Sequence, residues 1–92
     1  MIVRILGEGQ YTVPDARLDA LNVHDDALAA AVAAGDSMAF HAALDALLAE
    51  VRSAGESLPD AELVPSDVIL PSSSATIDEV REMSSDDGLV PG

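Results

Sequence analysis

Two histidines and a set of serines and aspartates are the residues of this sequence best suited to catalysis or metal binding. His24 and His41 belong to different predicted helices, and neither has a second ligand four residues further on. Ser37, His41 and Asp45 follow one another at intervals of four on one helix flank. A hydrolytic triad also needs a burying pocket and an oxyanion hole, and the sequence indicates neither. We therefore predict no metal site and no nucleophilic triad.

The remaining short motifs are also weak as chemical signals. The acidic pairs Asp25-Asp26 and Asp86-Asp87 lack the alternating oxygen ligands of a calcium loop. Residues 7–9, Gly-Glu-Gly, begin like a dinucleotide fingerprint, but Thr12 occupies the position of the third glycine. A chain of 92 residues leaves little room for a pocket that shifts the pKa of an acid or base. We predict that the protein is not an enzyme and binds no cofactor.

The charge of the chain restricts its partners. Seventeen acids against four basic residues give a net charge of −13, which repels phosphate backbones and anionic lipid headgroups. Because of this charge we expect no nucleic-acid binding. We also expect no direct membrane insertion, because no apolar run approaches the ~20 residues that span a bilayer. The absence of cysteine fits a cytoplasmic protein, which would reach a membrane only through a partner. Whether the acidity serves a partner or only solubility stays open.

The elements that must position these residues form an α+β, mostly helical fold within a single domain, residues 1–92. A β-hairpin is predicted over residues 2–13, around a glycine-rich turn. Two helices follow over residues 15–34 and 36–54, because Gly35 suits a helix end and Asp36 suits the N-cap of the next helix. The short connection makes them an antiparallel helical hairpin.

The last third of the chain is broken by prolines. Residues 56–75 are predicted to be extended, with Val68 to Leu70 forming either a third short strand or an extended cover on the core. Thr76 and Glu79 form a capping box for a short helix over residues 77–84. Residues 85–92 form a tail.

Each helix of the predicted hairpin has an apolar stripe, and the first stripe is interrupted. Asn22 and Asp25 fall on or beside the stripe formed by leucines and a valine. Either the helix restarts there with Asn22 as its cap, or it runs through with Asp25 half-buried and partnered, which we favour. A functional carboxylate at Asp25 is a further alternative. The second stripe comprises Phe40, Leu44, Leu47, Leu48 and Val51.

Opposite that second stripe lies a row of mostly small residues, which we predict as a partner interface. Small side chains let another helix approach closely, although alanine also fills surface positions simply because it favours helices. The row comprises Met38, Ala39, Ala42, Ala46, Ala49 and Ser53. The first helix carries a similar set at Ala20, Ala27, Ala30 and Ala34.

Distinctive phrases run from one end of the chain to the other. They include the opening MIVRILGEGQY (residues 1–11), AGD (34–36), LPD (58–60), ELVPSD (62–67), ILP (69–71) and the closing DDGLVPG (86–92). On these phrases the whole chain resembles the PspA-associated protein family, PspAA.

The resemblance implies a non-enzymatic partner of PspA in the phage-shock, membrane-stress response of prokaryotes. PspA is a long coiled-coil protein of the ESCRT-III-like class that coats and repairs stressed inner membrane. The resemblance brings no catalytic or ligand-binding residue with it. Our leading hypothesis is a cytoplasmic module that binds and modulates PspA by helix-on-helix docking. The alternative is a self-assembling homodimer that pairs its own alanine faces.

Overall fold

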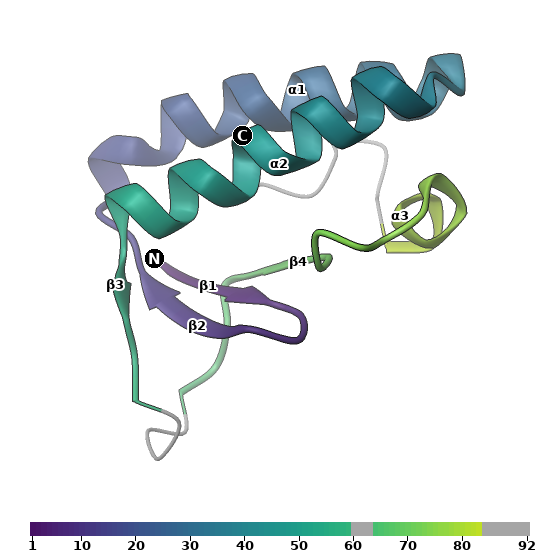
Figure 1. Cartoon of the computed structure of the whole chain (residues 1–92). Helices are drawn as coiled ribbons and strands as arrows, with labels where there is room; N and C mark the ends of the chain where they lie inside the picture. The colour runs from purple at the N-terminus through teal and green to yellow at the C-terminus, as the bar shows by residue number, and fades with distance from the viewer. Residues whose placement is uncertain (60–63, 84–92) are drawn as a thin grey trace.

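The computed structural model describes residues 1–59 and 64–83, and its helices and strands form two layers. One layer consists of α1 (Leu18–Ala34) and α2 (Ser37–Ala54), which pack side by side. The other layer consists of a four-stranded sheet and the short helix α3 (Ile77–Met83). Figure 1 shows the sheet beneath one half of the helical hairpin and α3 beneath the other half. The predicted α+β, mostly helical fold is confirmed.

The N-terminal hairpin consists of β1 (Ile2–Ile5) and β2 (Gly9–Thr12), as predicted. Gly7 and Gly9 both have positive φ angles, which only glycine adopts readily, so the turn needs them. Val3 is paired with Tyr11 and both point toward the helices. The inner face of the hairpin is therefore part of the core.

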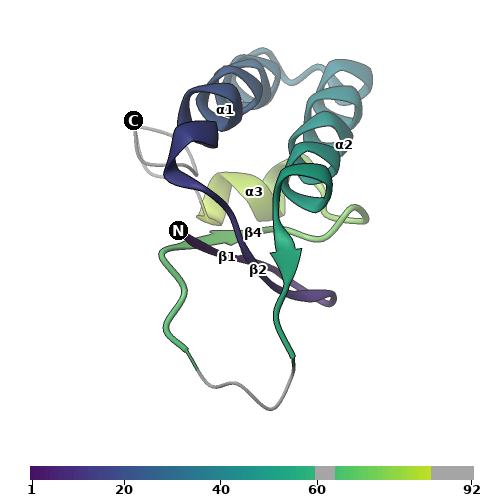
Figure 2. The same ribbon diagram turned by 90° about the vertical axis from the view of Figure 1, so that its left-hand side faces the viewer.

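Two further strands complete the sheet in the order β3-β2-β1-β4. β4 (Val68–Leu70) runs parallel to β1, which settles the open alternative in favour of a third strand. β3 (Glu56–Ser57) pairs antiparallel with β2 and was not predicted, because two polar residues carry no strand pattern. Figure 2 shows β3 descending directly from the end of α2. Its position is set by the edge that β2 offers, not by its own side chains.

The first long helix begins later than predicted. Asp15–Arg17 form a 3-10 turn, and the α-helix runs without a break from Leu18 to Ala34. A restart at Asn22 is therefore wrong, since this residue lies inside a continuous helix. Gly35 ends the helix in the left-handed conformation, with φ of 67°, as predicted.

The second long helix carries most of the core. Asp36 is its N-cap, and its carboxylate accepts a hydrogen bond from the backbone N–H of Ala39 at 3.1 Å. The apolar stripe is inaccessible to solvent: Phe40, Leu44, Leu47, Leu48 and Val51 are all 0% exposed. Burying five such side chains stabilises the fold by about 1.5–3 kcal/mol each before conformational entropy is counted.

The short helix α3 closes the core where the sheet does not reach. Thr76 Oγ1 accepts from Glu79 N–H at 3.2 Å and donates to the Glu79 carboxylate, so the threonine half of the predicted capping box is formed. Val80 is buried, and Arg81 Nη2 donates to Val32 O of α1 at 2.9 Å. The predicted end of this helix at residue 84 and the tail 85–92 lie outside the described residues. Within the described ranges, no helix is long and apolar enough to cross a bilayer.

Candidate protein-binding surface

The outer face of α2 carries the six residues predicted as a partner interface. Met38 is 86% exposed, Ala39, Ala42, Ala49 and Ser53 are exposed, and Ala46 is half-buried. The helix presents them to solvent because its opposite face is held by the apolar stripe that begins at Phe40. The surface is thus accessible to another protein, and its role as an interface stays a prediction.

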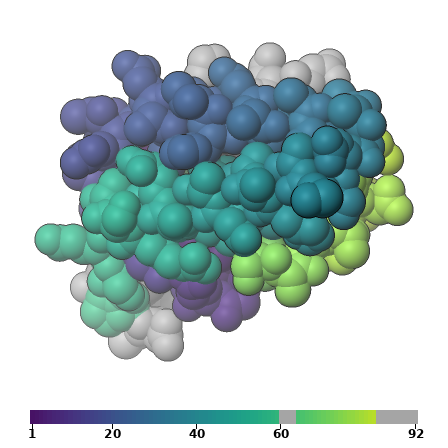
Figure 3. Space-filling model, turned by 45° about the horizontal axis from the view of Figure 1, so that its top comes forward, coloured from purple at the N-terminus to yellow at the C-terminus, as the bar shows by residue number. Residues whose placement is uncertain are grey.

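The outer face of α1 extends this surface. Ala27, Ala30 and Ala34 are exposed, Ala20 is half-buried, and Val23 is 67% exposed among them. Figure 3 shows the two helices side by side on one face of the molecule. Sequence reasoning missed Val23, although its spacing between Ala20 and Ala27 places it on the same stripe.

Both stripes repeat at alternating intervals of three and four residues. On α1 the stripe is Ala20, Val23, Ala27, Ala30 and Ala34; on α2 it is Ala39, Ala42, Ala46, Ala49 and Ser53. This spacing averages about 3.5 residues, the repeat by which helices pack along one another in coiled coils. We call these ten residues together the small-residue face. It is shaped to receive a helix with close backbone approach, because its side chains are short.

Acidic side chains border the small-residue face. Asp45 is exposed on one flank of α2 and Glu50 is half-buried on the other. Charges flanking a helix contact influence partner choice and association rate more than affinity.

Asn22 and Asp25 lie away from the small-residue face. Asp25 is only 2% exposed, more deeply buried than the half-buried position expected, and Asn22 is half-buried. In the described part of the chain no buried side-chain oxygen or nitrogen lacks a hydrogen-bond partner, and the Asp25 carboxyl group is among those that have one. A partnered carboxylate on the core side of a helix serves packing in the first place.

The other residues considered for chemistry do not come together. Ser37, His41 and Asp45 are all exposed on α2, and the structure gives no hydrogen bond among them. The His41 ring instead meets the Phe40 ring edge-on, with centroids 5.0 Å apart. Among residues 1–59 and 64–83 no three acidic or histidine side chains are grouped as metal ligands. Asp86 and Asp87 lie outside these ranges.

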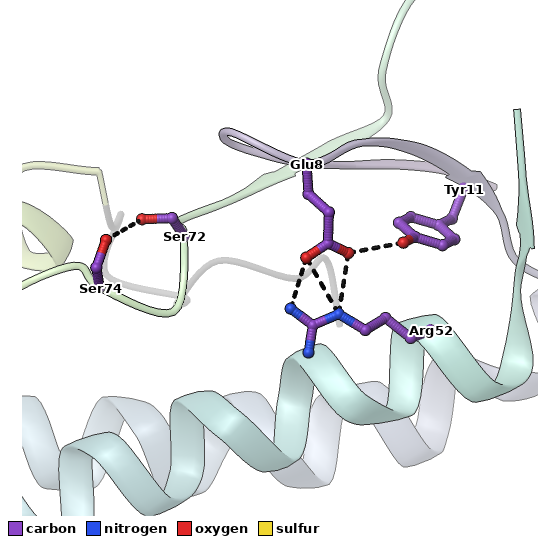
Figure 4. A network of polar contacts seen from close by, with 5 residues as sticks. All are labelled: Glu8, Tyr11, Arg52, Ser72 and Ser74. Atoms are coloured by element: carbon purple, nitrogen blue, oxygen red, sulfur yellow. Dashed lines mark hydrogen bonds and ion pairs between the residues drawn. The ribbon is translucent and has the colours of Figure 1, made fainter. Parts of the chain in front are cut away.

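One polar network was not foreseen from the sequence. Glu8, in the turn of the β-hairpin, accepts hydrogen bonds from Arg52 Nη2 at 2.6 Å, Arg52 Nε at 2.9 Å and Tyr11 Oη at 2.6 Å (Figure 4). The Arg52 and Tyr11 donors lower the pKa of the Glu8 carboxyl from 4.5 to about 2. Donating this hydrogen bond to the Glu8 carboxylate stabilises the protonated phenol and raises the pKa of Tyr11. The network fastens the hairpin turn to α2.

Comparison with known proteins gives one result. No curated protein and no solved structure matches this chain. A family model described as PspA-associated protein matches residues 1–92. The chain therefore belongs to the PspAA family, the PspA-associated proteins.

Proposed function

We propose that this chain is a non-enzymatic interaction module that binds a PspA-like coiled-coil protein and modulates its assembly or its association with the membrane. Membership of the PspAA family supports the choice of partner. The observation that carries the mode of binding is the small-residue face, in which two adjacent helices present the coiled-coil spacing to solvent.

Helix-on-helix docking follows from the chemistry of this face. Alanines bury little area each, so affinity must come from many contacts along two or three helical turns and not from a few anchors. Met38 and Val23, at 86% and 67% exposure, are the larger apolar side chains available to a partner helix. A long coiled coil offers such a partner along its whole length.

The net charge of −13 gives the interaction its electrostatic character. Asp45 and Glu50 would attract a helix whose flanks are basic, and the attraction would fall with ionic strength. The charge also keeps this chain from competing with PspA for anionic lipid. Recruitment to the inner face of the membrane would then occur only through the partner.

Co-purification of the chain with PspA from the same genome tests the proposal. Ala42→Glu and Ala46→Glu should each reduce the retained PspA at least ~10-fold, because a charged side chain would stand between closely packed helices. Ala33→Glu is the matched control, since Ala33 is exposed on α1 outside the small-residue face. Unchanged retention by both variants would refute this face as the docking site. If the wild-type chain fails to retain PspA, the proposed function itself is wrong.

Pairing of two copies through the same face is the competing outcome. Sedimentation of the isolated chain distinguishes the two. If the wild-type chain is a dimer and Ala42→Glu is a monomer, the small-residue face is a self-association interface. If the wild-type chain is a monomer at high concentration, the homodimer is excluded and the face is available to bind a different protein.

A further inference from the structure

The face of the sheet turned away from the helices combines exposed apolar side chains with polar ones, among them Thr12 and Glu56, which the strand register places on it. Because side chains alternate along a strand, those of Ile2, Arg4 and Leu6 lie opposite the core residues Val3 and Ile5. In the same way Ile69 of β4 points away from the core, between buried Val68 and Leu70. Figure 2 shows α1 and α2 on one side of the sheet only. We call Ile2, Arg4, Leu6 and Ile69 the outer sheet face.

Solvent reaches this face. Leu6 is 42% and Ile69 48% exposed, and Val64, 37% exposed, lies at its border. These are three of the five large apolar side chains exposed in the described part of the chain. A sheet with one solvated face normally alternates apolar residues inside with polar residues outside. Leu6 and Ile69 depart from this pattern, which makes the face a candidate contact surface.

A fixed wall borders the outer sheet face beside Gln10. The Gln10 side chain is only 6% exposed, and its Nε2 donates to Val64 O and to Ser66 Oγ, both at 2.8 Å. A second bond, from Leu58 N–H to Gln10 O at 2.9 Å, holds the start of the same connection. The chain at residues 64–66 is thus secured beside the face before any partner arrives, which lowers the entropic cost of binding.

Arg4 gives this surface its chemical selectivity. The strand register places it between Gln10 of β2 and Ile69 of β4, and it is exposed. Among the described residues Arg4 forms no ion pair, whereas Arg52 and Arg81 each have a carboxylate partner within the fold.

The acidic residue just before β4 is bound by a backbone N–H and forms no ion pair with Arg4. Asp67, two residues before Ile69, accepts a hydrogen bond from Ile2 N–H at 2.8 Å and is not ion-paired with Arg4. Arg4 has no ion pair among the described residues, and it lies beside Ile2, Leu6 and Ile69, so it complements a carboxylate that is flanked by apolar side chains.

We propose that the outer sheet face is a second docking surface, which takes a segment of the same partner bearing a carboxylate between apolar side chains. This inference rests on the proposed function and adds to it. The small-residue face and the outer sheet face lie on opposite sides of the molecule, so one chain can contact two segments of a partner, or two neighbouring partner molecules, at once. A module of this kind would bridge subunits of a coiled-coil assembly.

The test measures affinity for purified PspA by biolayer interferometry with the full chain and four variants. Arg4→Glu and Ile69→Glu should each weaken binding at least ~10-fold. Arg4→Lys should weaken it less, because the charge stays while the two-point bond to a carboxylate is lost. Arg17→Glu is the matched control: Arg17 is exposed in the 3-10 turn before α1, and its reversal changes the net charge equally. The affinity of Arg17→Glu for PspA should stay within about twofold of that of the wild-type chain.

Each result decides between the possibilities. Loss of affinity in Arg4→Glu and Ile69→Glu but not in Arg17→Glu supports the proposal. Wild-type affinity in both sheet-face variants overturns it while leaving the proposed function intact, and absence of binding by the wild-type chain overturns both. A wild-type dimer that becomes monomeric with Arg4→Glu would show a self-interface and refute the assigned occupant. Should Ile69→Glu fail to fold by circular dichroism, Ile69→Thr keeps the strand propensity and replaces it.

Discussion

Glu8 and Arg52 are 44 residues apart in the sequence and form a two-point ion pair between the turn of the β-hairpin and α2. The planar guanidinium donates through Nη2 to one carboxylate oxygen and through Nε to the other. Such a fork fixes orientation as well as distance. The pair therefore joins the hairpin turn to α2 in a defined orientation, in addition to the core contacts of Val3 and Ile5.

Glu8→Gln should destabilise the protein by about 0.5–1 kcal/mol at pH 7, a modest amount because both side chains are partly solvated. The pKa of Glu8 is about 2 in the fold and about 4.5 when unfolded. Its contribution is therefore complete above about pH 5 and disappears as the pH falls from about 4.5 to about 2. Urea unfolding followed by circular dichroism between pH 2 and pH 7 measures the difference in free energy of unfolding.

Glu82→Gln is the control for Glu8→Gln, because Glu82 is exposed on α3 and has no ion pair among the described residues. It should change the free energy of unfolding by less than about 0.5 kcal/mol at pH 7. If Glu8→Gln lowered the free energy of unfolding equally at pH 2 and pH 7, the negative charge of Glu8 would not be what stabilises its contact with Arg52.

Asp25→Ala should lower the free energy of unfolding by about 1–3 kcal/mol, because the carboxyl group is 2% exposed and its removal ends an interaction that it makes within the fold. The neighbouring Asp26 is exposed, and Asp26→Ala should be neutral within about 0.5 kcal/mol. Thermal unfolding of the two variants makes the comparison. If Asp25→Ala proved as stable as wild type, a structural role would be excluded, and a functional role of this carboxylate would have to be considered again.

Gly55→Ala should lower the free energy of unfolding by about 1–3 kcal/mol, because the added methyl group overpacks its surroundings. A Cβ at this position would lie 2.8 Å from Val51 O, 3.0 Å from Val13 Cγ2 and 3.2 Å from Thr12 O. Two of these contacts are backbone atoms, which cannot move aside cheaply. Chemical denaturation measures the loss.

Gly35 provides the comparison for Gly55, because it needs glycine for a different reason. Its φ of 67° is left-handed, but a Cβ there would meet nothing within 4 Å. Gly35→Ala should cost about 1 kcal/mol, and Gly35→Asn less, since asparagine tolerates this conformation. At Gly55 asparagine should be at least as harmful as alanine; a rescue there would contradict the steric explanation.

Gln10→Leu should release the chain at residues 64–66 and lower the free energy of unfolding by about 1–2 kcal/mol, since two hydrogen bonds of a buried amide are lost. Limited proteolysis reports the local release, and urea unfolding reports the stability. Gln10→Glu tests the assignment of the donor, because a carboxylate of the same shape cannot donate to Val64 O. If Gln10→Glu kept wild-type stability at pH 7, the amide would not be the donor.

The elements that the sequence predicted are those controlled by near neighbours. Gly35, Asp36 and the Thr76–Glu79 capping box act within four residues, and each has the predicted φ angle or hydrogen bond. The apolar period of α2 likewise places Phe40 and its companions in the core. The small-residue face could be located in the same way, because a helix that buries one stripe must expose the opposite one.

Long-range pairing was beyond sequence reasoning. β3 was missed because Glu56 and Ser57 become a strand only where β2 offers an unpaired edge. The parallel pairing of β4 with β1, the burial of Gln10 and the pairing of Glu8 with Arg52 each join residues that are 44 or more positions apart. No local propensity encodes such contacts.

The helical hairpin, the β-hairpin, the caps between them and membership of the PspAA family can all be read from the sequence, because periodicity, capping and shared phrases are properties of adjacent residues. Which surfaces remain exposed to solvent depends on how the helices and the sheet pack together. Ile69 and Leu6 look like core residues in the sequence, and Arg4 looks like an ordinary strand charge. They lie exposed side by side, and Arg4 has no ion pair among the described residues, because the two long helices cover only one side of the sheet.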